Sequence, residues 1–211
     1  MLDRKNFYID GKWVSPTEPR NHKVIDPSNE EICAEISLGG KKDVDKAVSA
    51  AKKAFETWAF SKKEERLDLL EKLYVVYKKR WAEMAKLISL EMGAPMTFST
   101  EMQAATGASH IKSFKNILKD FKFEKDLGEE KNNQKLLYEP KGVCALITPW
   151  NWPINQVNLK VIPALASACT VVLKPSEIAP LSSMLLAEMI DEVKFPPGVF
   201  NLVNGDGEIT G

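Results

Sequence analysis

The sequence predicts an α/β fold in which small β-hairpins and a layer of helices precede a parallel sheet. Three observations lead to this prediction. Residues 1–40 contain short strand-like runs separated by turn residues, and residues 43–121 carry apolar side chains at helical spacing. From residue 141 onward, apolar strands alternate with helical segments. A chain of 211 residues, 44% of them hydrophobic, is long enough to bury a substantial core.

Residues 1–40 are expected to form short strands. Asp10 and Gly11 separate the strand-like residues 7–9 from residues 12–14, and Asp-Gly favours the tight turn of a β-hairpin. Two further strands are expected at residues 24–25 and 32–36, on either side of a turn at Pro27-Ser28-Asn29.

Two helices are expected between residues 43 and 92. The first covers residues 43–58, whose apolar side chains define one face. The second is expected to begin with a capping box, in which Ser61 accepts the N3 amide and Glu64 reaches back to Ser61. Its helical pattern continues to Met92, and the following Gly93 predicts its end.

A further helix is expected from about residue 97 to residue 121, although Gly107 in its middle disfavours helical structure locally. Phe121-Lys122-Phe123 and Leu136-Leu137-Tyr138 flank the polar segment 127–135 and predict two strands joined by a loop.

After Pro140 the pattern becomes strand, helix, strand, helix, strand. We expect strands at residues 143–147, 170–173 and 199–203, with helices at about residues 154–168 and 181–192. Because the strands are apolar and separated by helices, this order predicts a parallel sheet covered on both faces.

The composition limits the classes of partner. Lys plus Arg and Asp plus Glu both total 29, so the chain lacks the basic excess that nucleic acids or anionic membranes attract. The apolar run 161–173 is too short to span a bilayer, and no secretory signal is expected at the start of the chain. We therefore expect neither nucleic acid nor membrane as a partner.

Cysteine and histidine usage points to a cytoplasmic protein without a metal site. Three cysteines without CxxC spacing are typical of reduced thiols; they are Cys33, Cys144 and Cys169. The two histidines, His22 and His110, lie far apart in the sequence, and no metal-ligand cluster is expected.

Polar residues follow each of the three late strands. A nucleotide-binding βαβ unit places glycines after its first strand and an acid after its second. Here Thr-Pro-Trp-Asn-Trp-Pro follows the first strand at 148–153, without GxGxxG, whereas Lys-Pro-Ser-Glu follows the second at 174–177. Taken alone, Lys-Pro-Ser-Glu is typical of a solvated turn, and Asn151 of a strand end or a helix cap.

In combination these segments resemble the aldehyde dehydrogenase superfamily. Residues 147–153 resemble its PWNFP-type signature, and residues 173–177 resemble its KPSE-type cofactor motif. Residues 195–203, which run into Gly205 and Gly207, resemble the segment that leads to its third cofactor strand. The opening hairpin, the helices and residues 91–95 also match, so the resemblance covers essentially the whole chain.

The resemblance implies the N-terminal part of the aldehyde dehydrogenase fold, ending in an incomplete Rossmann-like parallel sheet. It assigns residues 1–120 to the hairpin and helices of the cofactor-binding domain. Residues 121–140 would be bridging strands that join subunits. Residues 141–211 would form a partial βαβαβ dinucleotide-binding unit, and the catalytic domain is absent.

The resemblance also implies roles for individual residues. Asn151 would be catalytic: its side-chain amide would stabilise the oxyanion formed when a thiolate attacks the aldehyde, because an amide donates without titrating. Lys174 would donate to the adenosine ribose hydroxyls and Glu177 would accept from them. The Glu177 carboxylate repels a 2′-phosphate and favours NAD, while Ser176 beside Lys174 keeps NADP open. The remaining expected cofactor contacts are Ile147, Thr148, Pro149 and Trp150 in the cofactor channel, and Gly205 and Gly207 where the backbone approaches the adenosine.

The implied function is the NAD(P)-dependent oxidation of an aldehyde to a carboxylic acid through a cysteine thiohemiacetal, in a homodimer or homotetramer. This chain departs from the family pattern because the nucleophilic cysteine, the water-activating glutamate and the pyrophosphate loop are absent. Ala168-Cys169 also stands where the family usually has Gly-Asn. The chain alone is therefore expected to be inactive. The alternative is a non-catalytic module that binds a nucleotide or another subunit.

Overall fold

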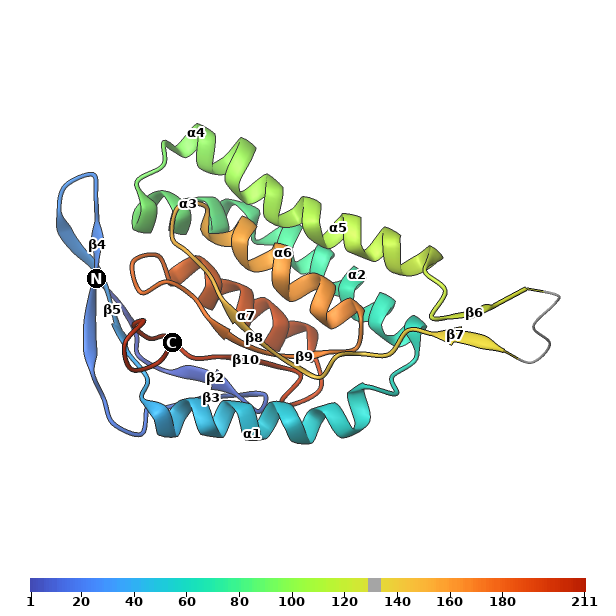
Figure 1. Ribbon diagram of the computed structural model, residues 1–211. Coiled ribbons are helices and arrows are strands. Elements are labelled where there is room, and N and C mark those ends of the chain that lie inside the picture. Colours follow the sequence, from blue (N-terminus) through green and yellow to red (C-terminus); the bar gives the residue numbers. More distant parts are fainter. Residues whose placement is uncertain (129–133) are drawn as a thin grey trace.

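The main sheet has five strands in the order β3-β2-β10-β9-β8 (Figure 1). The computed structural model describes residues 1–128 and 134–211. Strands β8 (Val143–Ile147), β9 (Thr170–Lys174) and β10 (Phe200–Leu202) run parallel, which confirms the predicted parallel sheet. The predicted hairpin, β2 (Phe7–Ile9) and β3 (Lys12–Val14), extends this same sheet, because β2 pairs antiparallel with β10.

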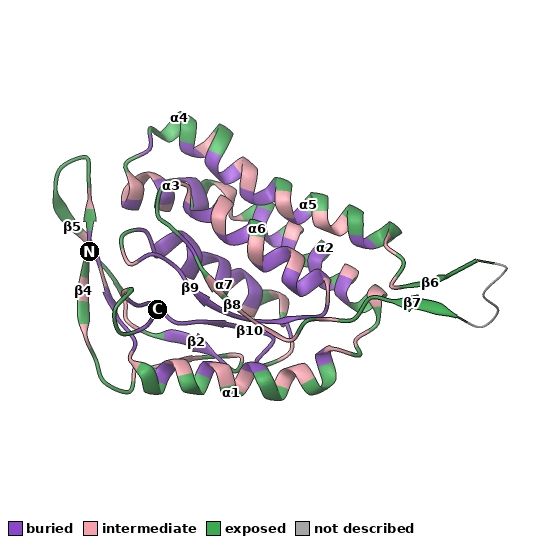
Figure 2. Cartoon of the chain, viewed as in Figure 1, coloured by how far each residue is buried: buried purple, intermediate pink, exposed green. Residues whose placement is uncertain are grey.

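Helices cover both faces of the sheet. Helix α1 (Lys41–Trp58) contacts one face, and α6 (Pro153–Ala166) and α7 (Leu181–Val193) contact the other. Every residue of β9 is buried between these layers, as Figure 2 shows. Small residues on α1 permit this helix to approach the sheet closely. The Thr170 hydroxyl on β9 donates to the Ala51 carbonyl oxygen on α1 at 3.0 Å. A sheet covered on both faces explains why its strands are continuously apolar.

An outer layer packs on α6 and α7. It consists of α2 (Lys63–Lys79), α3 (Trp81–Met92) and α5 (Ala104–Asp120). Short α4 (Met96–Phe98) and the π-helical turn η1 (Ser99–Gln103) lead into α5, so the expected helix at 97–121 is present. In the described part of the chain, no helix is long and apolar enough to cross a membrane.

Two predictions about the helices are wrong. Ser61 does not cap α2: its hydroxyl donates to the Trp58 carbonyl oxygen at 2.6 Å and closes the end of α1, while Lys62 is the N-cap residue. The expected continuous helix to Met92 is broken at Arg80, whose φ and ψ of −99° and 16° leave the helical region. The Arg80 guanidinium binds Glu83 and Glu188, which holds this break against α7.

Gly107 is required by tertiary contact. A Cβ atom there would overlap the Tyr77 hydroxyl, which donates to the Ala104 carbonyl oxygen at 2.9 Å. Because glycine has no side chain, α5 can approach α2 and α6 closely at this position.

Two smaller sheets lie outside the main sheet. In the first, β5 (Glu31–Ser37) lies between β1 (Leu2–Arg4) and β4 (Asn21–Asp26). The second is an exposed arm in which β6 (Glu124–Asp126) pairs antiparallel with β7 (Lys135–Leu137).

The arm begins later than the sequence predicts. Phe121 and Phe123 are not in a strand but form an aromatic cluster with Tyr138, in which the Phe121–Phe123 ring centroids are 4.8 Å apart. Packing of these rings against the body displaces the start of β6 to Glu124. Part of the loop predicted at 127–135 lies outside the described residues.

Candidate nucleotide-binding edge

The carboxyl ends of the three parallel strands meet at one edge of the sheet. The Thr148 amide donates to the Lys174 carbonyl oxygen at 3.3 Å, and the Val203 amide donates to the Leu173 carbonyl oxygen at 3.0 Å. A groove of about 420 Å³ lies between this edge and α1. Its lining includes Ile147, Lys174, Val203 and Thr210 from the edge, and Val44 and Val48 from α1. Open α/β sheets bind nucleotides in such crevices at the carboxyl ends of their strands.

Lys174 and Glu177 form an ion pair at this edge. The Lys174 ammonium group donates to Glu177 Oε2 at 3.4 Å and to the Gly205 carbonyl oxygen at 2.6 Å. Lys174 is only 9% exposed, whereas Glu177 is partly exposed. The pair thus places a donor and an acceptor side by side, which is the arrangement that a ribose diol requires.

Ser176 has a local structural contact. Its buried side-chain oxygen accepts the Ile178 amide at 3.3 Å and thereby shapes the turn between β9 and α7. The hydroxyl proton of Ser176 is still available to a ligand.

The loop after β8 presents groups suited to a ligand. The Thr148 hydroxyl is buried and has no hydrogen-bond partner within the described residues, so it fits a bound cofactor. Ile147 and Trp150 are large apolar side chains that are 57% and 47% exposed. Pro149 and Asn151 are exposed beside them, and none of the hydrogen bonds of the described side chains involves Asn151. Its amide is therefore free to donate.

The two glycines after β10 have different surroundings. A side chain at Gly205 would overlap Thr210, whose hydroxyl donates to the Gly39 carbonyl oxygen. Gly207 has open space around it, and a side chain there would meet nothing within 4 Å. The protein's own packing accounts for Gly205, independently of any ligand.

Arg20 was not identified from the sequence. Its guanidinium donates to Asp206 at 2.8 Å and to the Gly39 carbonyl oxygen at 2.6 Å, which fixes the segment after β10. Because 186 residues separate Arg20 from Asp206, no local pattern could have predicted this contact.

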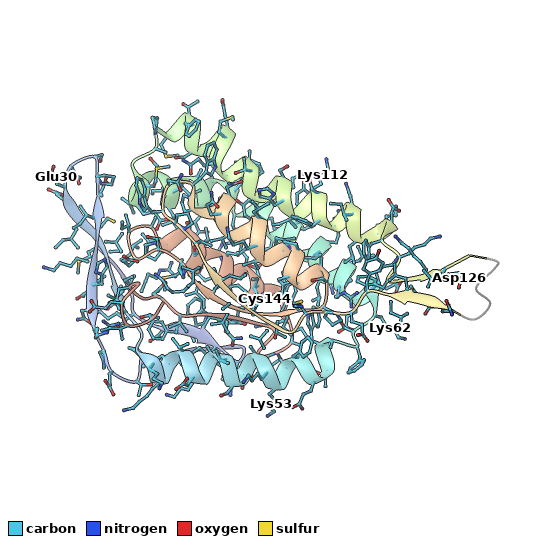
Figure 3. The ribbon with its side chains drawn as sticks, in the orientation of Figure 1. Glu30, Lys53, Lys62, Lys112, Asp126 and Cys144 are labelled. Carbon is cyan, nitrogen blue, oxygen red and sulfur yellow. The ribbon has the colours of Figure 1, made fainter. Side chains whose placement is uncertain are left out.

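Two of the three cysteines, Cys33 and Cys144, are poor nucleophiles in this structure. Burial raises the pKa of Cys33, and burial followed by the neighbouring Cys169 raises the pKa of Cys144 to about 11. Cys144, labelled in Figure 3, lies on β8 at the edge of the main sheet and is partly buried. A thiol with a raised pKa is protonated at neutral pH and reacts slowly. Among the described residues, no group of three His, Cys, Asp or Glu side chains could hold a metal ion.

A larger hollow of about 770 Å³ lies elsewhere. It is lined by residues that include Arg4, Lys5, Trp13 and Glu188. It contains none of the predicted site residues, and the chemistry of the edge does not extend to it.

The fold and this edge define an α/β unit whose polar groups follow the ends of parallel strands, and the segment after β8 is Thr-Pro-Trp-Asn-Trp-Pro instead of a glycine-rich phosphate loop. The aldehyde dehydrogenase family model matches residues 13–211. The chain belongs to the aldehyde dehydrogenase family.

Known proteins agree with this assignment over the whole chain. A 3-succinoylsemialdehyde-pyridine dehydrogenase from Pseudomonas sp is 51% identical over 208 residues, which cover 98% of this chain and 43% of that protein. The crystal structure of an aldehyde dehydrogenase from Bartonella henselae matches 100% of this chain and 44% of that one, with 55% identity and a TM-score of 0.98. Aldehyde dehydrogenase C from Pseudomonas syringae, in complex with NAD+ and octanal, is 43% identical with a TM-score of 0.94, covering 98% of this chain and 42% of that one. The chain thus spans less than half the length of these relatives, and the match confirms the N-terminal part of the aldehyde dehydrogenase fold.

Proposed function

We propose that this chain supplies the NAD-binding edge and the oxyanion donor of an enzyme that oxidises an aldehyde to a carboxylic acid through a cysteine thiohemiacetal. The observation that carries the proposal is the Lys174–Glu177 pair at the carboxyl edge of the parallel strands. The nucleophilic cysteine and the general base would come from a part of the enzyme outside these 211 residues.

Lys174 and Glu177 would hold the adenosine ribose, with Lys174 donating to its hydroxyls and Glu177 accepting from them. Thr148 would donate its unpaired hydroxyl to the cofactor, and Trp150 and Ile147 would cover its apolar surface. Bound NAD supplies a hydride acceptor. Asn151 would donate to the substrate oxygen when negative charge develops there, which lowers the barrier.

NAD is the proposed cofactor. A carboxylate beside the ribose repels the 2′-phosphate of NADP, and the similar structure of aldehyde dehydrogenase C from Pseudomonas syringae contains NAD+. The partly exposed position of Glu177 supports this preference.

The substrate of the complete enzyme would be an aldehyde that carries a second polar group. The relative from Pseudomonas sp is named a 3-succinoylsemialdehyde-pyridine dehydrogenase. This chain is 51% identical to that relative over the matched length. We also propose that the complete enzyme is a homodimer or homotetramer, because the exposed β6–β7 arm offers two short strands to another subunit. A cytoplasmic location is proposed on the cysteine usage described above.

A second candidate function is a subunit-binding or nucleotide-binding module without catalysis. The pKa of Cys144, raised to about 11 by burial, favours it for the 211 residues alone, because a protonated thiol is a poor nucleophile.

The test is an Asn151→Ala substitution in a protein extended to the full length of the relatives. NADH formation is followed by absorbance, with Asn116→Ala on the exposed side of α5 as the matched control. Loss of one oxyanion donor should lower kcat by about a hundredfold, while the control keeps full activity. Equal rates in both variants would contradict the role of Asn151.

A further inference from the structure

A hollow of about 500 Å³ lies where the β6–β7 arm meets the body of the molecule (Figure 1), and we call it the arm-foot pocket. Its walls come from the turn between α1 and α2, the start of α2 and the residues that flank the arm; they include Phe60, Arg66, Phe123 and Tyr138. Within the part of the chain that the structure describes, it shares no lining residue with the groove at the carboxyl edge of the sheet. A volume of this size is typical of sites for small molecules.

Arg66 is a buried charge in the wall of this pocket. Its side chain is 5% exposed, and Nη1 donates to the Ser61 carbonyl oxygen and, at 3.0 Å, to the Ser61 hydroxyl. Nε is buried and has no hydrogen-bond partner, and among the described residues the guanidinium forms no ion pair. Burial lowers the pKa of Arg66, and the nearby carboxylates of Glu65 and Glu64 offset this only in part. Because a guanidinium stays charged in a protein, its burial costs free energy unless it is paired.

The unpaired side of the guanidinium has the shape of a carboxylate site. Nε and Nη2 form one edge of the planar group, and neither donates to a described residue. Two parallel N–H groups of this kind bind both oxygens of a carboxylate. The Phe123 ring, whose centroid is 5.1 Å from Arg66 Cζ, holds the guanidinium in place.

Aromatic side chains surround the space beside Arg66. Phe60 is 86% exposed and Tyr138 is 41% exposed, and both line the pocket. Exposed aromatic rings around a single buried charge suit a flat apolar ligand that carries one charged group.

The other charged residues of the pocket favour an anion. The Lys63 ammonium group donates to the carbonyl oxygens of Lys119 at 3.0 Å and Phe121 at 3.5 Å, which keeps this second cation at the pocket. Among the described lining residues Glu139 is the only acid, and it is exposed. Two cations and one carboxylate leave the lining with a net positive charge, which attracts anions.

We propose that the arm-foot pocket binds a small carboxylate anion with an aromatic body. The carboxylate accepts from Nε and Nη2 of Arg66, and the ring packs against Phe60 and Tyr138. The inference rests on Arg66 and its surroundings and does not depend on the proposed oxidation of aldehydes.

The experiment is a titration of the full-length protein with 4-fluorobenzoate, followed by fluorine NMR. The uncharged 4-fluorobenzamide is the comparison ligand. Because the complete enzyme is proposed to release a carboxylic acid, its active site is a second place for the probe, and variants at the pocket identify which site binds. These variants are Arg66→Met, Phe60→Ala and Glu139→Gln. Lys62→Met is the matched control, because Lys62 is exposed and does not line the arm-foot pocket.

We expect saturable binding of 4-fluorobenzoate to the wild type and to the control. Arg66→Met should weaken it about ten- to hundredfold, the effect of losing hydrogen bonds to a charged group, and 4-fluorobenzamide should bind the wild type more weakly by a similar factor. Phe60→Ala should weaken binding about two- to tenfold through loss of a ring contact. Glu139→Gln should strengthen it about two- to fivefold, because a like charge is removed. Phe60 and Glu139 are exposed, so their opposite effects decide the matter if Arg66→Met does not fold.

Two results would overturn the inference and leave the proposed function intact. Absence of saturable binding to the full-length wild type means that another segment of the enzyme fills the pocket or that it has no carboxylate ligand. Equal affinity of the wild type, Phe60→Ala and Glu139→Gln for 4-fluorobenzoate means that the probe binds elsewhere. The role of Asn151 in aldehyde oxidation is tested separately by its own substitution.

Discussion

Glu91 gives the fold a specific dependence on pH. Its side chain is 1% exposed at the end of α3, and its carboxylate accepts the amides of Leu181 and Ser182, the latter at 3.0 Å. These amides are the unsatisfied donors at the start of α7, so Glu91 caps a helix that lies 90 residues further along the chain. Burial nevertheless outweighs these hydrogen bonds and raises the pKa of Glu91 from 4.5 to about 7.

The size of the effect on the free energy of unfolding follows from this pKa shift. A carboxyl group whose pKa rises from 4.5 to about 7 on folding keeps its proton longer in the folded state than in the unfolded state. Between these two pH values the folded state binds more protons, so its free energy of unfolding decreases as pH rises. The full pKa shift contributes about 3 kcal/mol to the free energy of unfolding; this contribution is present below pH 4.5 and lost above pH 7.

A Glu91→Gln substitution removes the titration and keeps the shape of the side chain. We therefore expect the thermal midpoint of the full-length variant, relative to wild type, to be higher at pH 8 than at pH 5. Glu192→Gln, at an exposed position on α7, is the control and should show no such pH-dependent difference. Calorimetry at the two pH values makes the measurement. If the difference in thermal midpoint between Glu91→Gln and wild type is the same at pH 5 and pH 8, the Glu91 carboxyl group does not titrate in this range and the prediction is refuted.

Three further predictions concern the edge and the chain itself. Glu177→Gln in the full-length protein should weaken NAD binding a few-fold and improve NADP binding, because a charge facing the 2′-phosphate is removed; fluorescence titration with an unchanged NAD/NADP affinity ratio would refute the role of Glu177. The 211 residues alone should not form NADH from short aliphatic or aromatic aldehydes, and turnover that disappears in Cys144→Ser or Cys169→Ser would show that a cysteine of this chain acts as the nucleophile. The isolated chain should self-associate in sedimentation experiments, because β8 pairs only with β9 among the described strands and Ile147 is exposed on it; a monodisperse monomer with a cooperative melt would argue against this.

The positions of the candidate site residues were predictable because these residues follow strand ends. The apolar runs of β8 and β9 are local patterns, and parallel strands bring their carboxyl ends to one edge. Hence the proximity of Thr148 to Lys174 follows from strand order alone. The individual functional roles still come from family resemblance, and the Glu177 and Asn151 substitutions are the experiments that address them.

The sequence by itself determined the α/β class, the helical faces and the order of strands in the parallel unit, because hydrophobic period and turn chemistry act over a few residues. Only the tertiary structure decided contacts between distant segments. The pairing of β2 with β10, the capping of α7 by Glu91 and the His110–Asn155 contact each join residues far apart in the chain. The failed capping box at Ser61 has a local cause, since its hydroxyl donates to the Trp58 carbonyl oxygen three residues earlier, where α1 ends. A side chain with several available partners is assigned to one of them by packing, and packing is a property of the whole chain.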